Sequence, residues 1–142
     1  MMLRLLLEMS FDISEKNRFP YQKVSDTKYT FKTSENEYIV EFTKYYSQSK
    51  TYERTYRSKS KGFRGLTNEG KAIKVIATVT AITLDFMKSN NNWEDIVIKP
   101  VSDKRSRVLQ LFFNQPYFNN YYIEEIEPNE FHITRKQPIN EK

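Results

Sequence analysis

The sequence predicts an α+β domain in which a long central helix and a second, shorter helix pack on a mostly antiparallel sheet. Short apolar runs between turn residues, in the first half and near the end of the chain, are typical of strands. One long stretch between them repeats its apolar residues with helical periodicity. A chain of 142 residues has the usual size of one domain, which we expect to span residues 1–136, with a flexible tail over 137–142.

The first half of the chain is predicted to be sheet. A polar segment that runs through Tyr21 gives only a weak signal. Residues 33–37 are predicted to form the turn of a hairpin, because polar residues there separate two runs rich in β-branched and aromatic residues. The expected strands are Met1–Phe11, Tyr29–Phe31, Tyr38–Phe42 and Thr51–Arg57, of which the second and third form the hairpin.

The central helix is predicted from Thr67 to about Ser89. Lys74, Thr78 and Asp85 recur on one side at helical spacing and predict a polar face. Thr67 is the expected N-cap, since its hydroxyl can accept from an amide of the first turn. The opposite, wider stripe is apolar and consists of Ala72, Val75, Ile76, Val79, Ile82 and Phe86.

The second half continues with a strand, a helix and a hairpin. Asp95–Ile98 is a short apolar run of the buried-strand type, and Ser102–Asn114 shows a second helical pattern that Pro116 ends. Tyr121–Glu127 and Glu130–Arg135 are predicted to be strands joined by the turn at Pro128 and Asn129.

Composition excludes several classes of function. The chain has no cysteine, which excludes disulfide scaffolds, thiolate metal sites and cysteine nucleophiles. Its single histidine, His132, argues against imidazole metal sites and most histidine-based catalysis, so we assign no metal site and no catalytic residue. The apolar run Leu5–Leu7 is too short for a signal peptide or a membrane span. We therefore expect a cytoplasmic protein without a membrane partner.

The loop that enters the central helix is the first candidate binding site. Unpaired amides at a helix N-terminus, reached through glycines and flanked by cations, favour an anion such as phosphate. The alternative is that the glycines serve only loop geometry and packing. The candidate residues are Arg64, Thr67, Gly70, Lys71 and Ala72.

The start of the second helix is another candidate anion site. Lys104, Arg105 and Arg107 lie in its first turns, where cations oppose the helix dipole. A bound anion or an acidic partner would offset that repulsion. The alternative is a solvated face on which Asp103 compensates locally.

A basic, aromatic-rich run over residues 44–64 is the third candidate. It holds seven basic residues and one acidic residue, a net charge of +6, whereas the whole chain carries +5. Cations next to tyrosines suit a single-stranded nucleic acid, whose phosphates and bases they would contact. The same pattern also describes a strand with aromatic residues toward the core and cations in water. The candidate residues are Lys44, Lys50, Tyr52, Arg54, Tyr56, Arg57, Lys59 and Lys61.

The stretch Thr67-x-x-Gly70-x-Ala72 at the start of a long helix resembles the Gln/Arg-x-x-Gly-x-Gly/Ala loop of GNAT-type N-acetyltransferases. The resemblance implies that this loop holds the pyrophosphate of acetyl-CoA, and that the cofactor lies where the strands before and after the helix separate. Leu111-Phe112-x-x-x-Pro116-Tyr117 is similar to the family's later Leu-Tyr-x-x-x-Gly-Phe. Thr67 replaces the Gln or Arg, Phe112 the tyrosine often used as general acid, and Pro116 the glycine.

The chain also resembles small uncharacterised proteins of tailed bacteriophages. Thr67, Gly70, Ala72, Val75, Thr78 and Val79, followed by Ser106-Arg107, carry this similarity, which implies no established activity. We expect a non-catalytic accessory or virion-associated protein whose basic face binds nucleic acid or a phage or host protein, in the host cytoplasm or the virion. Self-association is left open. The alternative function is a GNAT-like acyltransferase that uses acetyl-CoA.

Overall fold

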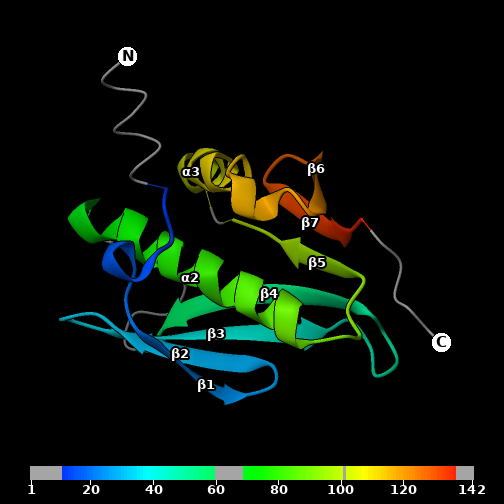
Figure 1. Ribbon diagram of the computed structural model, residues 1–142, viewed down its shortest axis with the longest axis horizontal. Helices are drawn as coiled ribbons and strands as arrows, with labels where there is room; N and C mark the ends of the chain where they lie inside the picture. Colours follow the sequence, from blue (N-terminus) through cyan, green and yellow to red (C-terminus); the bar gives the residue numbers. More distant parts are fainter. Residues whose placement is uncertain (1–10, 60–68, 101, 137–142) are drawn as a thin grey trace.

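The structure, a computed structural model, describes residues 11–59, 69–100 and 102–136. It has two layers, a seven-stranded sheet and two α-helices that both cover one face of this sheet (Figure 1). The predicted α+β class is therefore confirmed. The expected first strand, the expected N-cap Thr67 and the tail lie outside the described residues, apart from Phe11, which is in a turn.

The sheet is antiparallel except for one central pair of strands. Its spatial order is β1-β2-β3-β4-β5-β7-β6, and only β4 and β5 run parallel to each other. Both predicted hairpins, β2–β3 and β6–β7, are confirmed. The strands are β1 (Tyr21–Ser25), β2 (Lys28–Lys32), β3 (Glu37–Lys44), β4 (Thr51–Ser58), β5 (Asp95–Ile98), β6 (Tyr121–Glu127) and β7 (Glu130–Arg135).

Both predicted helices are present. The long helix α2 (Glu69–Ser89) lies across β1 to β4, and α3 (Asp103–Phe113) lies beside it over the other strands (Figure 1). Ser102 caps α3, because its hydroxyl accepts a hydrogen bond from the backbone N–H of Arg105 at 3.1 Å. Two short 3-10 helices, η1 (Glu15–Asn17) and η2 (Pro116–Phe118), precede β1 and β6.

The apolar stripe of α2 packs on the aromatic residues of the sheet. The ring of Phe86 stacks on Phe42 with centroids 4.0 Å apart and meets the edge of Tyr52 at 5.2 Å. The opposite side of the helix is not as polar as predicted, because Thr78 is completely buried. The segment before β1 covers it, and its hydroxyl accepts a hydrogen bond from the backbone N–H of Phe19 at 2.8 Å.

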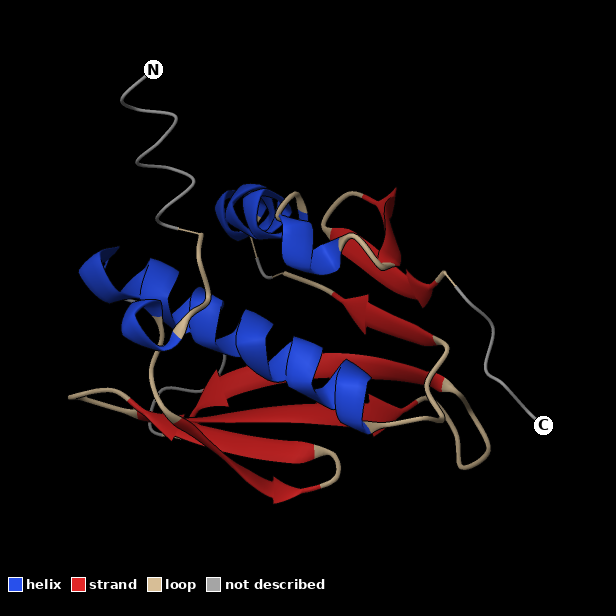
Figure 2. Ribbon diagram, viewed as in Figure 1, coloured by secondary structure: helices blue, strands red, loops and turns tan. Residues whose placement is uncertain are grey.

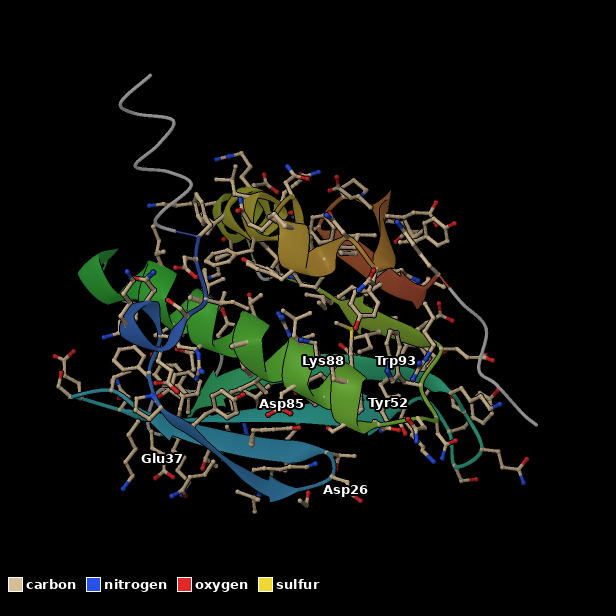
Figure 3. All side chains as sticks on the ribbon, in the orientation of Figure 1. Asp26, Glu37, Tyr52, Asp85, Lys88 and Trp93 are labelled. Carbon is tan, nitrogen blue, oxygen red and sulfur yellow. The ribbon has the colours of Figure 1, made fainter. Side chains whose placement is uncertain are left out.

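Trp93 fixes the end of α2 against the last strand. Its indole N–H donates to the Met87 carbonyl at 2.9 Å, and the Arg135 guanidinium lies 4.4 Å from the centre of its ring. Figure 3 shows Trp93 and Tyr52 together near the carboxyl end of α2. Trp93 is fully buried, so it belongs to the core.

Candidate ligand-binding cleft

The parallel pair β4 and β5 forms a seam in the middle of the sheet. Four residue pairs join the strands, from Thr51 with Asp95 to Arg54 with Ile98. At Ile98 strand β5 ends, whereas β4 continues to Ser58, and the two chains move apart toward their carboxyl ends (Figure 2). The two helices follow these strands and cover the opening from one side.

A cleft of about 280 Å³ lies at this opening. Four apolar residues form its walls, Ile76 and Val79 from α2, Leu109 from α3, and Pro100 after β5. Polar groups reach it from β4, from the residue that follows β5, and from α3. They belong to Glu53, Arg54, Thr55, Tyr56, Lys99 and Arg105.

Arg54 is a buried cation in this cleft. Its side chain points to the helix side of the sheet, and the residue is only 7% exposed. Its Nη1 donates to the Thr83 hydroxyl at 3.4 Å, a long hydrogen bond, while its Nε has no hydrogen-bond partner among the described residues. Burial lowers the pKa of Arg54 to about 10, so the guanidinium remains charged at neutral pH.

No carboxylate within the described part of the chain forms an ion pair with Arg54. Such an arrangement is rare, because a charge removed from water is costly unless an opposite charge or several hydrogen bonds replace the solvent. Among the described residues, Arg54 is the one charged residue that is buried.

Tyr56 and Arg105 complete the polar part of the cleft. The guanidinium of Arg54 lies 5.7 Å from the centre of the Tyr56 ring. Burial raises the pKa of the Tyr56 hydroxyl, while the charges of Arg54 and Arg105 act in the opposite direction. Tyr56 is therefore a neutral hydroxyl between two cations at neutral pH.

The predicted basic, aromatic-rich face is not one exposed surface. Side chains alternate along β4, so Tyr52, Arg54 and Tyr56 all point toward the helices, and Tyr52 is 3% exposed. The aromatic residues do lie on the core side, as the alternative interpretation of this run expected. Arg54 accompanies them, which that interpretation did not expect, since it placed the cations in water.

Two cations, one on the other face of β4 and one just after this strand, have acidic partners. Arg57 lies 3.6 Å from Glu41, and Lys59 lies 3.4 Å from Glu37. Lys44 and Lys50 flank the loop between β3 and β4, where Lys44 donates to the Ser47 carbonyl at 3.4 Å. Lys61 lies outside the described residues.

The two predicted anion sites differ in how much of each the structure describes. Arg64 and Thr67 of the loop before α2 lie outside the described residues, and the backbones of Gly70, Lys71 and Ala72 belong to the first turn of α2. At the start of α3, Lys104 and Arg107 are exposed to solvent. Arg105 instead lines the cleft, so the structure separates it from these two cations and places it with Arg54.

That Arg54, Tyr56 and Arg105 line one cleft was not predicted from the sequence. One signal was available, because Tyr52, Arg54 and Tyr56 have the spacing of a single strand face. Nothing in the sequence indicates that Arg105, about fifty residues later, approaches the same place, since that depends on the parallel pairing of β4 with β5.

No family model, curated protein or solved structure matches this chain. None of the described helices combines the length and the apolar character that a membrane span requires. Among the described residues, no three His, Asp or Glu side chains gather as metal ligands would.

Proposed function

We propose that this chain is a binding domain for an acyl-coenzyme A, whose acyl end enters the cleft between β4 and β5. The observation that carries the proposal is the separation of these two strands beyond Arg54 and Ile98. In the GNAT family, which the chain resembles at Thr67-x-x-Gly70-x-Ala72, the cofactor lies in such a gap. The order of helix, strand, helix and terminal hairpin after β4 also agrees with that resemblance.

The topology supports a ligand at this place on general grounds. In sheets with parallel strands, ligands bind beyond the carboxyl ends of neighbouring strands, where connecting helices leave room. The cleft is close to the lower limit of known ligand pockets, about 300 Å³. It therefore suits the acyl group and the adjoining part of the arm, and leaves the nucleotide outside.

The free edge of β4 supports an extended ligand that carries amides. Beyond Arg54, the described part of β4 is paired only with β3, so its other edge faces the cleft without a strand partner. An extended chain can pair with such an edge through its own N–H and C=O groups, as a peptide does when it adds to a sheet. The pantetheine arm contains two amides.

The proposal concerns binding and assigns no catalytic residue. Phe112, at the position of the family's tyrosine, is fully buried and packs edge-on against Phe11 at 4.9 Å. A scaffold of this kind without that hydroxyl would serve as a binding module, which also agrees with the non-catalytic role we expect from the phage resemblance.

Thermal unfolding and ¹H–¹⁵N NMR test this function. Acetyl-CoA should raise the melting temperature, since a ligand at a hundred times its Kd stabilises the native state by about 2.7 kcal/mol. The amides of Thr55, Tyr56 and Arg105 should shift, while those of Gln22 and Thr30 on β1 and β2, away from the cleft, should not. No stabilisation at millimolar acetyl-CoA, or shifts confined to other sites, would contradict the proposal.

A second candidate function is contact with an acidic partner through the loop between β3 and β4. This loop retains a small part of the expected basic, aromatic surface, because Tyr45 and Tyr46 are 51% and 69% exposed next to Lys44. Exposed aromatic rings beside cations suit the bases and phosphates of a single strand.

Fluorescence anisotropy with a labelled single-stranded DNA tests the second candidate. Binding should weaken as salt rises, and replacing Tyr45 and Tyr46 by Ala should remove about 1–3 kcal/mol of affinity for each base that is stacked. Ile126→Ala is the control, since Ile126 is 52% exposed on β6 and has no aromatic ring. Equal losses from both variants, or no salt dependence, would reject this candidate.

A further inference from the structure

The cleft has an unusual electrostatic character for its size. Its walls are apolar, yet two guanidinium groups, those of Arg54 and Arg105, reach it from different elements. Arg54 belongs to the strand that forms the vertex of the opening, at the last residue pair between β4 and β5. Lys99 and Glu53 also line the cleft, so its charged residues are three cations and one carboxylate, and Arg54 places a positive charge at the vertex.

The unused hydrogen-bonding capacity of Arg54 indicates what kind of group belongs there. Within the part of the chain that the structure describes, its Nε is buried without a hydrogen-bond partner and no carboxylate neutralises the guanidinium. A buried polar group without a partner needs an explanation, and a ligand that supplies the missing acceptor is one. The planar guanidinium matches a carboxylate, which can accept two parallel N–H bonds from it.

We propose that Arg54, assisted by Arg105, binds the carboxylate of a ligand that enters the cleft. The ligand would combine this carboxylate with an apolar segment that contacts Ile76, Val79 and Leu109. The inference rests on the proposed function only for the place at which the ligand enters. If an acyl-coenzyme A binds there, the carboxylate is either the free end of a dicarboxylic acyl chain or that of a separate acid beside it.

Isothermal titration calorimetry with the full chain distinguishes these sources. The probes are acetyl-CoA, succinyl-CoA and succinate, each added to wild type and to Arg54→Met. Arg57→Met is the matched control, because Arg57 lies on the same strand but on the opposite face, next to Glu41. Thermal unfolding without ligand checks that each variant folds. If Arg54→Met does not fold, Arg105→Met replaces it as the test variant.

Wild type should bind succinyl-CoA at least about tenfold more tightly than acetyl-CoA, as expected for a hydrogen-bonded charge pair. Arg54→Met should abolish this preference, and Arg57→Met should preserve it. If the carboxylate comes from a separate acid, succinate should bind to wild type and to Arg57→Met, and should lose at least about tenfold in affinity with Arg54→Met.

The inference and the proposed function can fail separately. If acetyl-CoA and succinyl-CoA bind equally well and Arg54→Met changes no affinity, the carboxylate site is overturned while cofactor binding stands. If neither thioester binds but succinate binds through Arg54, the proposed cofactor is wrong and the carboxylate site stands. If none of the three probes binds, both are overturned.

Discussion

The hydroxyl of Thr78 lies 2.8 Å from the backbone nitrogen of Phe19 and joins α2 to the chain that precedes β1. The same hydroxyl donates to the carbonyl of Lys74, one turn earlier in the helix, also at 2.8 Å. A side chain that belongs to the predicted polar face therefore satisfies a backbone donor in a partly buried position. The long helix is covered on both sides as a result.

Thr78→Val should lower the free energy of unfolding by about 1–3 kcal/mol, because it keeps the shape and leaves the Phe19 N–H without an acceptor. Urea denaturation followed by the fluorescence of Trp93, the single tryptophan, measures this. Thr80→Val is the control, since the Thr80 hydroxyl is buried without a hydrogen-bond partner and its removal should not destabilise. Equal losses at both positions would mean that the bond to Phe19 contributes nothing.

Stability in alkaline solution should depend on Tyr21. Burial and the hydrogen bond to the Asp85 carboxylate at 3.0 Å raise the pKa of Tyr21 to about 12, whereas an unfolded chain has the ordinary value of 10.0. Asp85 lies on the side of α2 that faces β1 and β2 (Figure 3).

Between these two pKa values the unfolded state releases the proton that the folded state retains, so stability falls as pH rises from about 10 to about 12. Tyr21→Phe should reduce this fall, and it should have little influence on the shape of the profile below pH 9 or so, where both states keep the proton. Urea midpoints over that range measure the effect. An unchanged alkaline profile would contradict the raised pKa.

Arg54→Met should leave the free chain at least as stable as wild type. The substitution removes a buried charge that no described carboxylate neutralises, and replacing buried charges by apolar residues is often neutral or stabilising by about 1–4 kcal/mol. Thermal unfolding without ligand measures this. A clear loss of stability would show that the hydrogen bond to Thr83 and the contact with Tyr56 outweigh the cost of burying the charge.

The turn between β6 and β7 should tolerate glycine better than alanine at Asn129. This residue has a φ of 62°, in the left-handed region, which costs a residue with a Cβ about 1–2 kcal/mol. Its side chain also donates to Asp103 at 2.7 Å. Both variants lose that bond, so the difference between Asn129→Ala and Asn129→Gly in urea denaturation measures the cost of the left-handed backbone conformation. Identical urea midpoints for the two variants would contradict this cost.

Most of the fold could be predicted from local patterns. Asp95–Ile98 is a continuous apolar run and coincides with β5, and the terminal hairpin has the predicted bounds on both strands. Strand β1 was missed because it lies at the edge of the sheet, and only Tyr21 of its five residues is even partly buried. Such a strand has no alternation of apolar and polar residues that could be detected.

The candidate site could be predicted only in part. Tyr52 and Tyr56 face the core, and the alternation of side chains along the strand places Arg54 between them on the same side. Cations are almost always assigned to water, because burial without a partner is costly. The burial of Thr78 could not be predicted either, because the segment that covers it is distant in the sequence.

The seam between β4 and β5 also joins two parts of the molecule that differ in how local their contacts are. Strands β1 to β4 form a meander of short connections, and β6 and β7 a single hairpin, so each group can nucleate from neighbouring residues. Pairing of β4 with β5 brings together strands separated by residues 59–94, so it carries the entropic cost of closing a long loop. The cleft is lined by residues from both sides of this crossover, so any ligand that occupies it selects molecules in which both halves have docked.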